Sequence, residues 1–324
     1  MAGLSLGLTI SSEEFAPTRL VEVAVLAEEA GFDFVSISDH YHPWVSEQGH
    51  SPFVWSILGA ISQATDEIEV AVGVSCPTIR IHPAILAQSA ATTGALLDGR
   101  FVWGVGTGEA LNEHVVGEAW PPYEIRAEMM EEAISVIRRL WSEESVTHFG
   151  QYYTVVDARI LDRPEEPVPI IVSAFGPESA ELAASLGDGL WITGAAEETV
   201  KVFRRAGGKG PVYSQMTLCW AEAKSEAIET AHRLWAFSEL PGTLNQDLPT
   251  MLHYEEAVKL VTPEMVAKST PCGPDPGPIL EAARKAVKAG VDHLYFHQIG
   301  PDQEGFVEFW KKELRDELLA LQAA

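Results

Sequence analysis

Cysteine and basic residues are scarce in this chain. Its 324 residues include three cysteines, Cys76, Cys219 and Cys272, and no two of them form a C-x-x-C pair. This odd count argues against a disulfide framework and a structural zinc site, and it favours a reducing, cytoplasmic location. Only 22 residues are basic against 47 acidic ones, a formal net charge of −25. Such a surface repels phosphate backbones and anionic lipid, so we expect neither nucleic acid nor membranes as partners.

Long apolar runs are also missing. No segment approaches the roughly 20 apolar residues that a membrane-spanning helix requires. The first residues carry no basic segment and reach acidic positions before any apolar run, which is unlike a signal peptide. The chain does have 46% hydrophobic and 9% aromatic residues. This is enough for a substantial core, and it excludes disorder and a fibrous fold.

Short apolar segments alternate with helical patterns along the chain. The strand-like segments are residues 4–9, 34–38, 68–74, 101–105, 170–173, 189–192, 212–220 and 293–297. These segments are followed by apolar residues at helical spacing. The first such helix has Leu20, Val23 and Ala27 on one face and ends at Gly31. Strands joined by helical crossovers are parallel, and eight such units close into a barrel.

The predicted fold is therefore α/β, a (β/α)₈ TIM barrel. No break in composition divides the chain, so we expect a single domain over residues 1–324. A less regular helical region at 225–268 and a closing helix at 303–319 belong to this pattern. The longer insertions, residues 40–50, 142–168 and 236–275, are expected over the C-terminal face of the strands.

Barrel enzymes carry their chemistry at the C-terminal ends of the strands, so the residues that follow each strand are the candidates. His40 follows the second strand in the segment S-D-H-Y-H-P-W, beside Asp39 and four residues before Trp44. Imidazole is the usual proton acceptor near neutral pH, and a nearby carboxylate can orient it or raise its pKa. The plainer alternative is a surface-loop histidine. We favour a role for His40 as a catalytic base, because other strand ends also carry polar, glycine-rich clusters.

The fourth strand leads into the segment G-T-G-E at residues 106–109. Its glycines expose backbone N–H groups that suit a ring or a phosphate, although a tight turn is equally compatible. The segment is neither a Walker loop nor a G-x-G-x-x-G fingerprint. Glu109 is either a general acid facing His40 or an ordinary acidic residue near a helix start. Residues 173–177, S-A-F-G-P, lead into a helix N-terminus. The segment can therefore bind an anion, or it can be an ordinary turn.

Three segments together resemble the bacterial-luciferase-like superfamily. They are L-G-L-x-x-S-x-E-x-F-A-P at residues 6–17, S-D-H-x-x-P-W at 38–44 and G-V-G-T-G-E-A-L-N-E at 104–113. Within the superfamily, the chain is similar to the coenzyme F420-dependent dehydrogenases that act on glucose 6-phosphate or secondary alcohols. The similarity covers nearly the whole chain and is densest in the first 115 residues.

The resemblance implies a homodimer that binds F420, a deazaflavin, and oxidises an alcohol or sugar hydroxyl by hydride transfer. It implies three catalytic residues: His40 as the base, Glu109 as the proton donor to the deazaflavin, and Trp44 as the indole over the active site. The implied cofactor contacts are Asp39, Gly73, Val74, Cys76, Gly106, Thr107, Gly108, Asn112, Ala174, Phe175 and Gly176. Gly73 and Val74 match the position of a non-prolyl cis peptide bond in that group.

The implied substrate pocket departs from the sugar-phosphate enzymes. Their three phosphate-binding cations match Ala196, Asn245 and Ser269 here, and Thr193 and Trp44 are the other expected substrate contacts. Without charge-assisted bonds, nothing evident offsets the desolvation of a phosphate dianion. We therefore expect a non-phosphorylated alcohol or sugar as the substrate.

Other functions remain open from the sequence. The chain can also be a glucose-6-phosphate dehydrogenase of the same group, or an FMN- or F420-dependent reductase or monooxygenase. A non-catalytic, cofactor-binding barrel is a further alternative. From a different class, a metal-dependent barrel hydrolase would use His40 and His42 with His293 or His297. Such a site needs further ligands at other strand ends, and because none is conspicuous we expect no metal.

Overall fold

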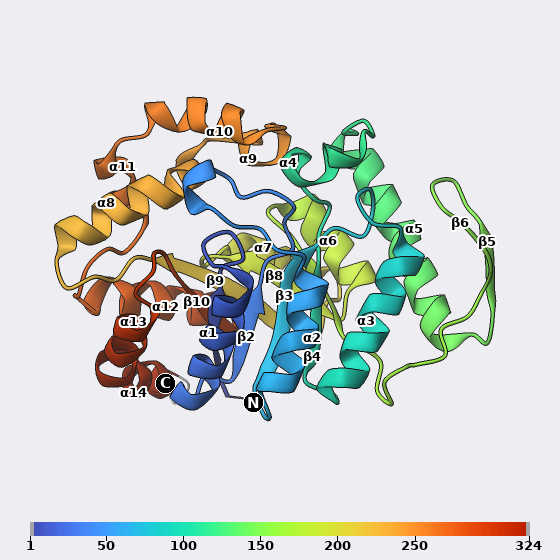
Figure 1. Cartoon of the computed structure of the whole chain (residues 1–324), viewed down its shortest axis with the longest axis horizontal. Coiled ribbons are helices and arrows are strands. Elements are labelled where there is room, and N and C mark those ends of the chain that lie inside the picture. Colours follow the sequence, from blue (N-terminus) through green and yellow to red (C-terminus); the bar gives the residue numbers. More distant parts are fainter. Residues whose placement is uncertain (1–2, 322–324) are drawn as a thin grey trace.

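A computed structural model describes residues 3–321 of the chain. Its centre is a closed barrel of eight parallel strands with helices around it (Figure 1). The barrel strands are β1 (Ser5–Ile10), β2 (Phe34–Ile37), β3 (Glu69–Ser75), β4 (Phe101–Val105), β7 (Ile170–Ser173), β8 (Gly189–Thr193), β9 (Val212–Leu218) and β10 (His293–Gln298). They follow one another in chain order, and β10 pairs with β1 to close the ring. The predicted (β/α)₈ barrel is confirmed.

The outer helices begin and end where local chemistry dictates. They are α1 (Pro17–Ala30), α2 (Val54–Ala64), α3 (Pro83–Leu97), α5 (Tyr123–Ser142), α6 (Pro177–Leu186), α7 (Glu197–Arg205) and α12 (Gly277–Ala289). Proline occupies the first turn of α1, where its missing N–H costs nothing. Gly31 ends α1 with φ 81°, and its N–H bonds back to the last turn. The expected closing helix is divided into α13 (Gln303–Phe309), a π-helical turn (Trp310–Leu314) and α14 (Arg315–Ala320).

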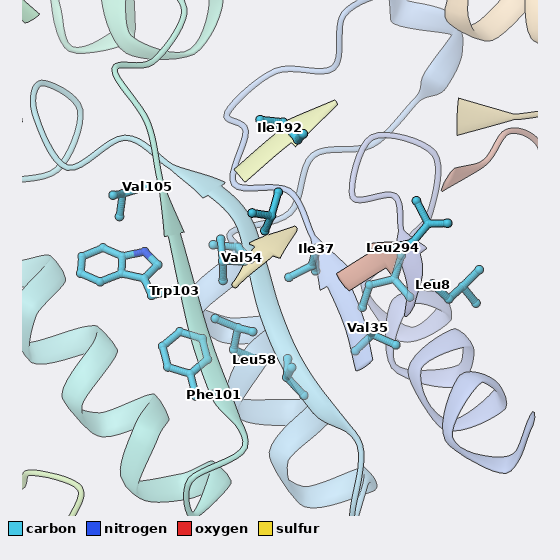
Figure 2. Close-up of a cluster of buried hydrophobic side chains, with 14 of the residues drawn as sticks. Leu8, Val35, Ile37, Val54, Leu58, Phe101, Trp103, Val105, Ile192 and Leu294 are labelled. Carbon is cyan, nitrogen blue, oxygen red and sulfur yellow. The ribbon is translucent and has the colours of Figure 1, made fainter. Parts of the chain in front are cut away.

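Two apolar layers hold the barrel together, because alternate side chains of a strand point outward and inward. Figure 2 shows the outer layer, in which Leu8 and Ile37 of the strands and Leu58 of α2 belong to one buried cluster. The inner layer fills the barrel with Trp191, Tyr213 and other rings. Trp191 stacks on Tyr213 at 4.8 Å between ring centroids. The interior is therefore a packed core, and the open space lies above it.

The insertion after β9 covers the C-terminal ends of the strands. It consists mainly of α8 (Lys224–Trp235), α9 (Leu244–Asp247), α10 (Met251–Ala257) and α11 (Pro263–Ser269), which lie above the barrel in Figure 1. The less regular helical region predicted at residues 225–268 thus consists of several short helices. Among residues 3–321, no helix combines the length and apolar character needed to cross a membrane.

The insertion at residues 142–168 lies elsewhere than predicted. It forms a hairpin of β5 (Val146–Phe149) and β6 (Thr154–Ala158) that stands beside α5, away from the barrel mouth (Figure 1). Glu132 of α5 holds it there, with 2.9 Å between its Oε1 and His148 Nε2. The same carboxylate accepts backbone N–H bonds from the hairpin turn. The prediction that this insertion covers the mouth is wrong, because these contacts fasten it to the flank.

Candidate active site

A cavity of about 590 Å³ opens at the C-terminal ends of the barrel strands. All eight strands, or the loops that follow them, contribute residues to its lining. Trp191 and Tyr295 close it below, where the Trp191 indole N–H donates to the Tyr295 hydroxyl over 2.6 Å. The volume falls in the range of small-molecule sites, and the position is the one barrel enzymes use.

Most of the predicted site residues line this cavity. They are Asp39, His40, Trp44, Gly73, Val74, Cys76, Gly106, Thr107, Gly108, Glu109, Asn112, Phe175, Gly176 and Thr193. The expected meeting of the loops after β2, β3, β4 and β7 at one mouth is therefore present. What each residue does there stays a prediction.

Four predicted residues lie outside the lining. Ala174 is buried and its N–H bonds to the carbonyl of Trp191. Ala196 packs against the main core at the start of α7, and Ser269 donates its hydroxyl to Glu239. Asn245 lies in α9, and its chain neighbours Gly242, Thr243 and Gln246 line the cavity instead.

His40 lies between two glutamates. Its Nδ1 is 2.6 Å from Glu13 Oε1, and its Nε2 is 3.5 Å from Glu109 Oε2. Burial alone would lower the pKa of His40, but the charge and hydrogen bond of Glu13, aided by Glu109 and Asp39, raise that pKa to about 9. A histidine so placed can hold a proton at one nitrogen and exchange it at the other.

Glu13 is a candidate site residue that the sequence alone did not single out. It is buried, and the hydroxyls of Ser11 and Ser38 donate to it over 2.9 and 2.6 Å. Burial favours its neutral form, yet His40 and these hydrogen bonds hold the pKa of Glu13 well below its ordinary value. A signal for it existed, because Glu13 is the glutamate of the opening motif at residues 6–17. Since β1 and β2 are neighbours in the barrel, the loop after β1 lies near His40.

Asn112 joins the two loops that carry His40 and Glu109. Its side-chain oxygen accepts the backbone N–H groups of Tyr41 and His42 over 2.8 and 3.0 Å. Its amide nitrogen donates to Glu109 Oε2 over 3.2 Å. Burial raises the pKa of Glu109, partly against the attraction of His40. The Asn112 side chain thus ties Glu109 to the loop that carries His40.

Arg80 pairs with two buried carboxylates, those of Asp39 and Glu113. It donates to Asp39 Oδ1 over 2.7 Å and to the Asp39 carbonyl over 3.0 Å. Its backbone N–H bonds to Glu113 Oε2 over 2.8 Å. Burial raises the pKa of Glu113 to about 7 in spite of Arg80. Nε of the guanidinium also lies 3.6 Å from Glu113 Oε1, so Asp39 and Glu113 both pair with Arg80, which is not part of the cavity lining.

Aromatic side chains form one wall of the cavity. Trp44 stacks on Phe237, with 4.6 Å between ring centroids and 17° between planes. It meets His40 edge-on at 5.4 Å and contacts Tyr254 in the same way at 5.2 Å. Because Phe237 and Tyr254 belong to the insertion after β9, this wall joins the loop after β2 to the insertion above the barrel.

The opposite wall fits a flat, polar heterocycle such as a deazaflavin. The peptide bond between Gly73 and Val74 is cis, as the resemblance implied. A Cβ on Gly106 would lie 3.0 Å from Val74, so bare backbone packs closely here. At the end of β3, Ser75 Oγ is buried without a hydrogen-bond partner among the described residues. Close-packed glycines and an unpaired polar atom are what a ring with polar edges requires.

The alternative of a metal hydrolase finds no ligand set. Residues 3–321 contain no group of three or more His, Cys, Asp or Glu side chains placed to hold a metal ion. His42 Nδ1 lies 3.2 Å from the carbonyl of Leu111. His293 begins β10, at the other end of the barrel, where it stacks on Tyr213. The four histidines of that hypothesis are therefore spread over the barrel.

Comparisons with known proteins agree with this geometry. The family model described as luciferase-like monooxygenase matches residues 4–293. The F420-dependent glucose-6-phosphate dehydrogenase of Segniliparus rotundus is 36% identical over 333 residues, which cover 98% of this chain and 99% of that protein. The enzyme of the same description from Mycolicibacterium smegmatis is 36% identical over 336 residues, covering 99% and 100%.

Solved structures point the same way. An F420-dependent secondary alcohol dehydrogenase in complex with an F420–acetone adduct superposes with a TM-score of 0.90, at 29% identity, over 98% of this chain and 99% of that one. The coenzyme F420-dependent tetrahydromethanopterin reductase of Methanopyrus kandleri gives a TM-score of 0.79 at 20% identity, over 98% and 100%, and this likeness shows the fold alone. With its barrel, its strand-end cavity and a family match that spans most of its length, this chain belongs to the luciferase-like monooxygenase family.

Proposed function

We propose that this chain is a coenzyme F420-dependent dehydrogenase that oxidises the hydroxyl group of an uncharged alcohol or sugar. The observation that carries the proposal is the Glu13–His40–Glu109 cluster in a cavity that no lysine or arginine lines among the described residues. The F420-dependent dehydrogenases at 36% identity, aligned along nearly their whole length, support the cofactor and the reaction class.

The glycine-rich wall of the cavity suits the deazaflavin ring of the cofactor. Gly73, Val74 and the loop of residues 106–108 would hold the ring, and Phe175 and Gly176 lie at the cavity rim before α6. Bound F420 supplies the hydride acceptor, which no side chain can provide. The remaining roles, the transfer of protons and the placing of substrate, fall to the residues of this chain.

His40 is the base in this proposal. As the substrate carbon loses hydride, its hydroxyl must lose a proton, and Nε2 of His40 is the nitrogen not bonded to Glu13. Glu13 holds the ring through Nδ1, fixes its orientation and stabilises the imidazolium that forms. Burial raises the pKa of Glu109, and in this proposal Glu109 is the acid that would donate a proton to the deazaflavin. Trp44 packs against His40 and limits where the substrate can lie.

The charge of the cavity favours an uncharged substrate. Its lining contains five carboxylate side chains: Glu13, Asp39, Glu109, Glu113 and Glu178. The guanidinium of Arg80 is already bonded to Asp39 and lies 3.6 Å from Glu113 Oε1 through its Nε. A phosphate dianion would lose its hydration without gaining charge-assisted bonds. The uncharged Ala196, Asn245 and Ser269 offer no replacement.

A substrate panel tests the proposal. The enzyme with F420 is assayed on glucose 6-phosphate, glucose and simple secondary alcohols by loss of deazaflavin absorbance at fixed ionic strength. We expect kcat/KM to be at least about tenfold higher for the best uncharged substrate, the size of one lost charge-assisted hydrogen bond. A tenfold preference for glucose 6-phosphate would contradict the proposed substrate, and no F420-dependent turnover at all would contradict the reaction.

Three broader properties belong to the same proposal. The chain forms one domain over residues 1–324, assembles as a homodimer and works in the cytoplasm. The homodimer is open to direct measurement by light scattering of the purified protein, where a monomer mass would overturn it.

A further inference from the structure

A second histidine–glutamate pair contributes to the same cavity. His297, at the end of β10, lies with its Nε2 3.2 Å from Glu14 Oε1, and the two side chains are 1% and 3% exposed. Glu14 has its own anchor, since its Oε2 accepts the backbone N–H of Gly300 over 2.7 Å. The pair therefore holds His297 in one orientation and leaves Nδ1 as its remaining polar atom.

Nδ1 of His297 has no use inside the described chain. It is buried, and no residue of 3–321 bonds to it. Because a buried polar atom loses its bonds to water, native proteins rarely leave one unpaired without a reason. With Nε2–H donating to Glu14, the neutral ring offers Nδ1 as an acceptor, and a protonated ring offers a donor. A hydroxyl group can bond to either form.

The neighbours of His297 extend this into a polar layer. Thr9 follows Leu8 of β1, the residue that pairs with Phe296 of β10, so Thr9 is one position beyond that pair, as His297 is. Thr9 Oγ1 is also buried and unpaired among the described residues. Thr9, Gln215 and His297 all line the cavity. Two adjacent strands thus present two unfilled hydrogen-bond positions at the same level.

An aromatic ring lies over this layer. Trp235 meets His297 edge-on, with 4.2 Å between ring centroids and 67° between planes. Trp235 also lines the cavity, and Phe237 lies 4.6 Å from it between centroids. The carbon skeleton of a ligand can pack on these rings while its oxygens reach the polar layer.

We propose that His297 Nδ1 and Thr9 Oγ1 bind a second hydroxyl group of the substrate. The substrate is then a diol or a sugar, and a simple mono-alcohol leaves both atoms unpaired. The inference rests on the proposed function, because the first hydroxyl is the one that His40 deprotonates. A site built to bond a hydroxyl discriminates strongly against the analogue that lacks it.

The test compares 2,3-butanediol with 2-butanol, which differ by one hydroxyl on the same skeleton. In the wild type with F420, kcat/KM for the diol should exceed that for 2-butanol by about tenfold or more. His297→Gln places an amide near the position of Nε2 and keeps the contact with Glu14, but it removes Nδ1. It should lower the preference for the diol about tenfold, mainly through KM. His297→Asn keeps a polar atom near Nδ1 and should retain part of the preference.

Thr9→Val is the second variant, because it keeps the shape of the side chain and removes only the other unpaired oxygen. It should lower the diol preference in the same direction, with 2-butanol turnover and the F420 Kd within about twofold of wild type. An equal loss on both alcohols, or weaker F420 binding in place of lost preference, would overturn the inference. Equal use of both alcohols by the wild type would overturn it alone. If neither these alcohols nor any substrate of the panel is turned over with F420, the proposed function is overturned as well.

Discussion

The proton on His40 is controlled by its surroundings. Burial favours the neutral ring, but Glu13 at 2.6 Å, with Glu109 and Asp39 beyond it, raises the pKa of His40 to about 9. Only the neutral ring can accept the substrate proton, so alcohol oxidation should become faster as pH rises toward that value. In the reverse direction the protonated ring is the acid, and carbonyl reduction should slow only as pH rises through and above that value.

Glu13→Gln tests this control. The substitution keeps the shape and removes the negative charge that does most to raise the pKa of His40. The midpoint of the kcat/KM profile for alcohol oxidation should therefore move to lower pH, while the largest rate falls because the imidazolium loses its partner. The exposed Glu22 of α1 provides the control, Glu22→Gln. A midpoint that stays in place in Glu13→Gln would show that Glu13 does not set the proton affinity of His40.

His40→Ala separates catalysis from cofactor binding. Turnover should fall by about 10²–10⁴-fold, the usual contribution of a general base, while the F420 Kd stays close to wild type. The reason is that the residues that would hold the ring, Gly73, Val74 and residues 106–108, lie in β3 and in the loop after β4. His50→Ala, at an exposed histidine, serves as the matched variant. Unchanged turnover in His40→Ala would remove this residue from the mechanism.

Single residues were predicted well where a local motif named them, and less well where two loops had to meet. His40, Trp44 and Glu109 all belong to short segments with their own signals, and all three line the cavity. The contact of Glu13 with His40 depends on the pairing of β1 with β2, which no local pattern contains. His297 was considered only as a metal ligand, because the sequence does not show that Glu14 takes one of its nitrogens.

At the scale of elements, the loop after β4 is the most tightly constrained part of the site. Gly108 has φ 80°, and a Cβ there would lie 2.6 Å from Cys76 Sγ and 3.0 Å from Glu113 Cγ. The loop therefore needs glycine for its backbone conformation and for the space beside β3. Any side chain at this position must displace the wall that would bind the cofactor ring.

Gly108→Ala and Gly117→Ala form a matched pair for this loop. Both glycines have positive φ, but a Cβ at Gly117 meets nothing within 4 Å. Gly117→Ala should cost only the backbone strain of about 1 kcal/mol, whereas Gly108→Ala adds roughly 1–3 kcal/mol of overpacking. Thermal unfolding and F420 titration should show a larger fall in Tm and weaker binding for Gly108→Ala. Equal effects would mean that the space beside Cys76 is not limiting.

Periodicity located the elements but not every position in space. The barrel strands and the helices between them follow from apolar spacing, because burial on the strands and on one face of each helix leaves that imprint. The hairpin of β5 and β6 was misplaced, since its position depends on Glu132 of α5 accepting bonds from residues 148–153. Its exposed Phe149 and Val156 gave no sign of which surface it would join.

The whole molecule carries a net charge of −25, and its cavity repeats that sign. The two effects act over different distances. Carboxylates in the lining act at contact range and are poorly screened, whereas the surface charge acts through solvent and is screened by salt. An anionic substrate meets both, and an uncharged one meets neither. Ionic strength therefore separates the influence of the whole surface from that of the cavity.

The expected result is a fall in KM for glucose 6-phosphate as salt increases from about 0.01 to 0.15 M, because the Debye length shrinks from about 30 to 8 Å. The KM of an uncharged substrate from the panel should stay nearly constant, which controls for general effects of salt on the enzyme. Even in high salt, glucose 6-phosphate should remain the poorer substrate, since the carboxylates of the cavity are still unscreened. If KM for glucose 6-phosphate instead rises with salt, an attractive cationic contact must exist. The argument from uncharged residues at 196, 245 and 269 would then fail.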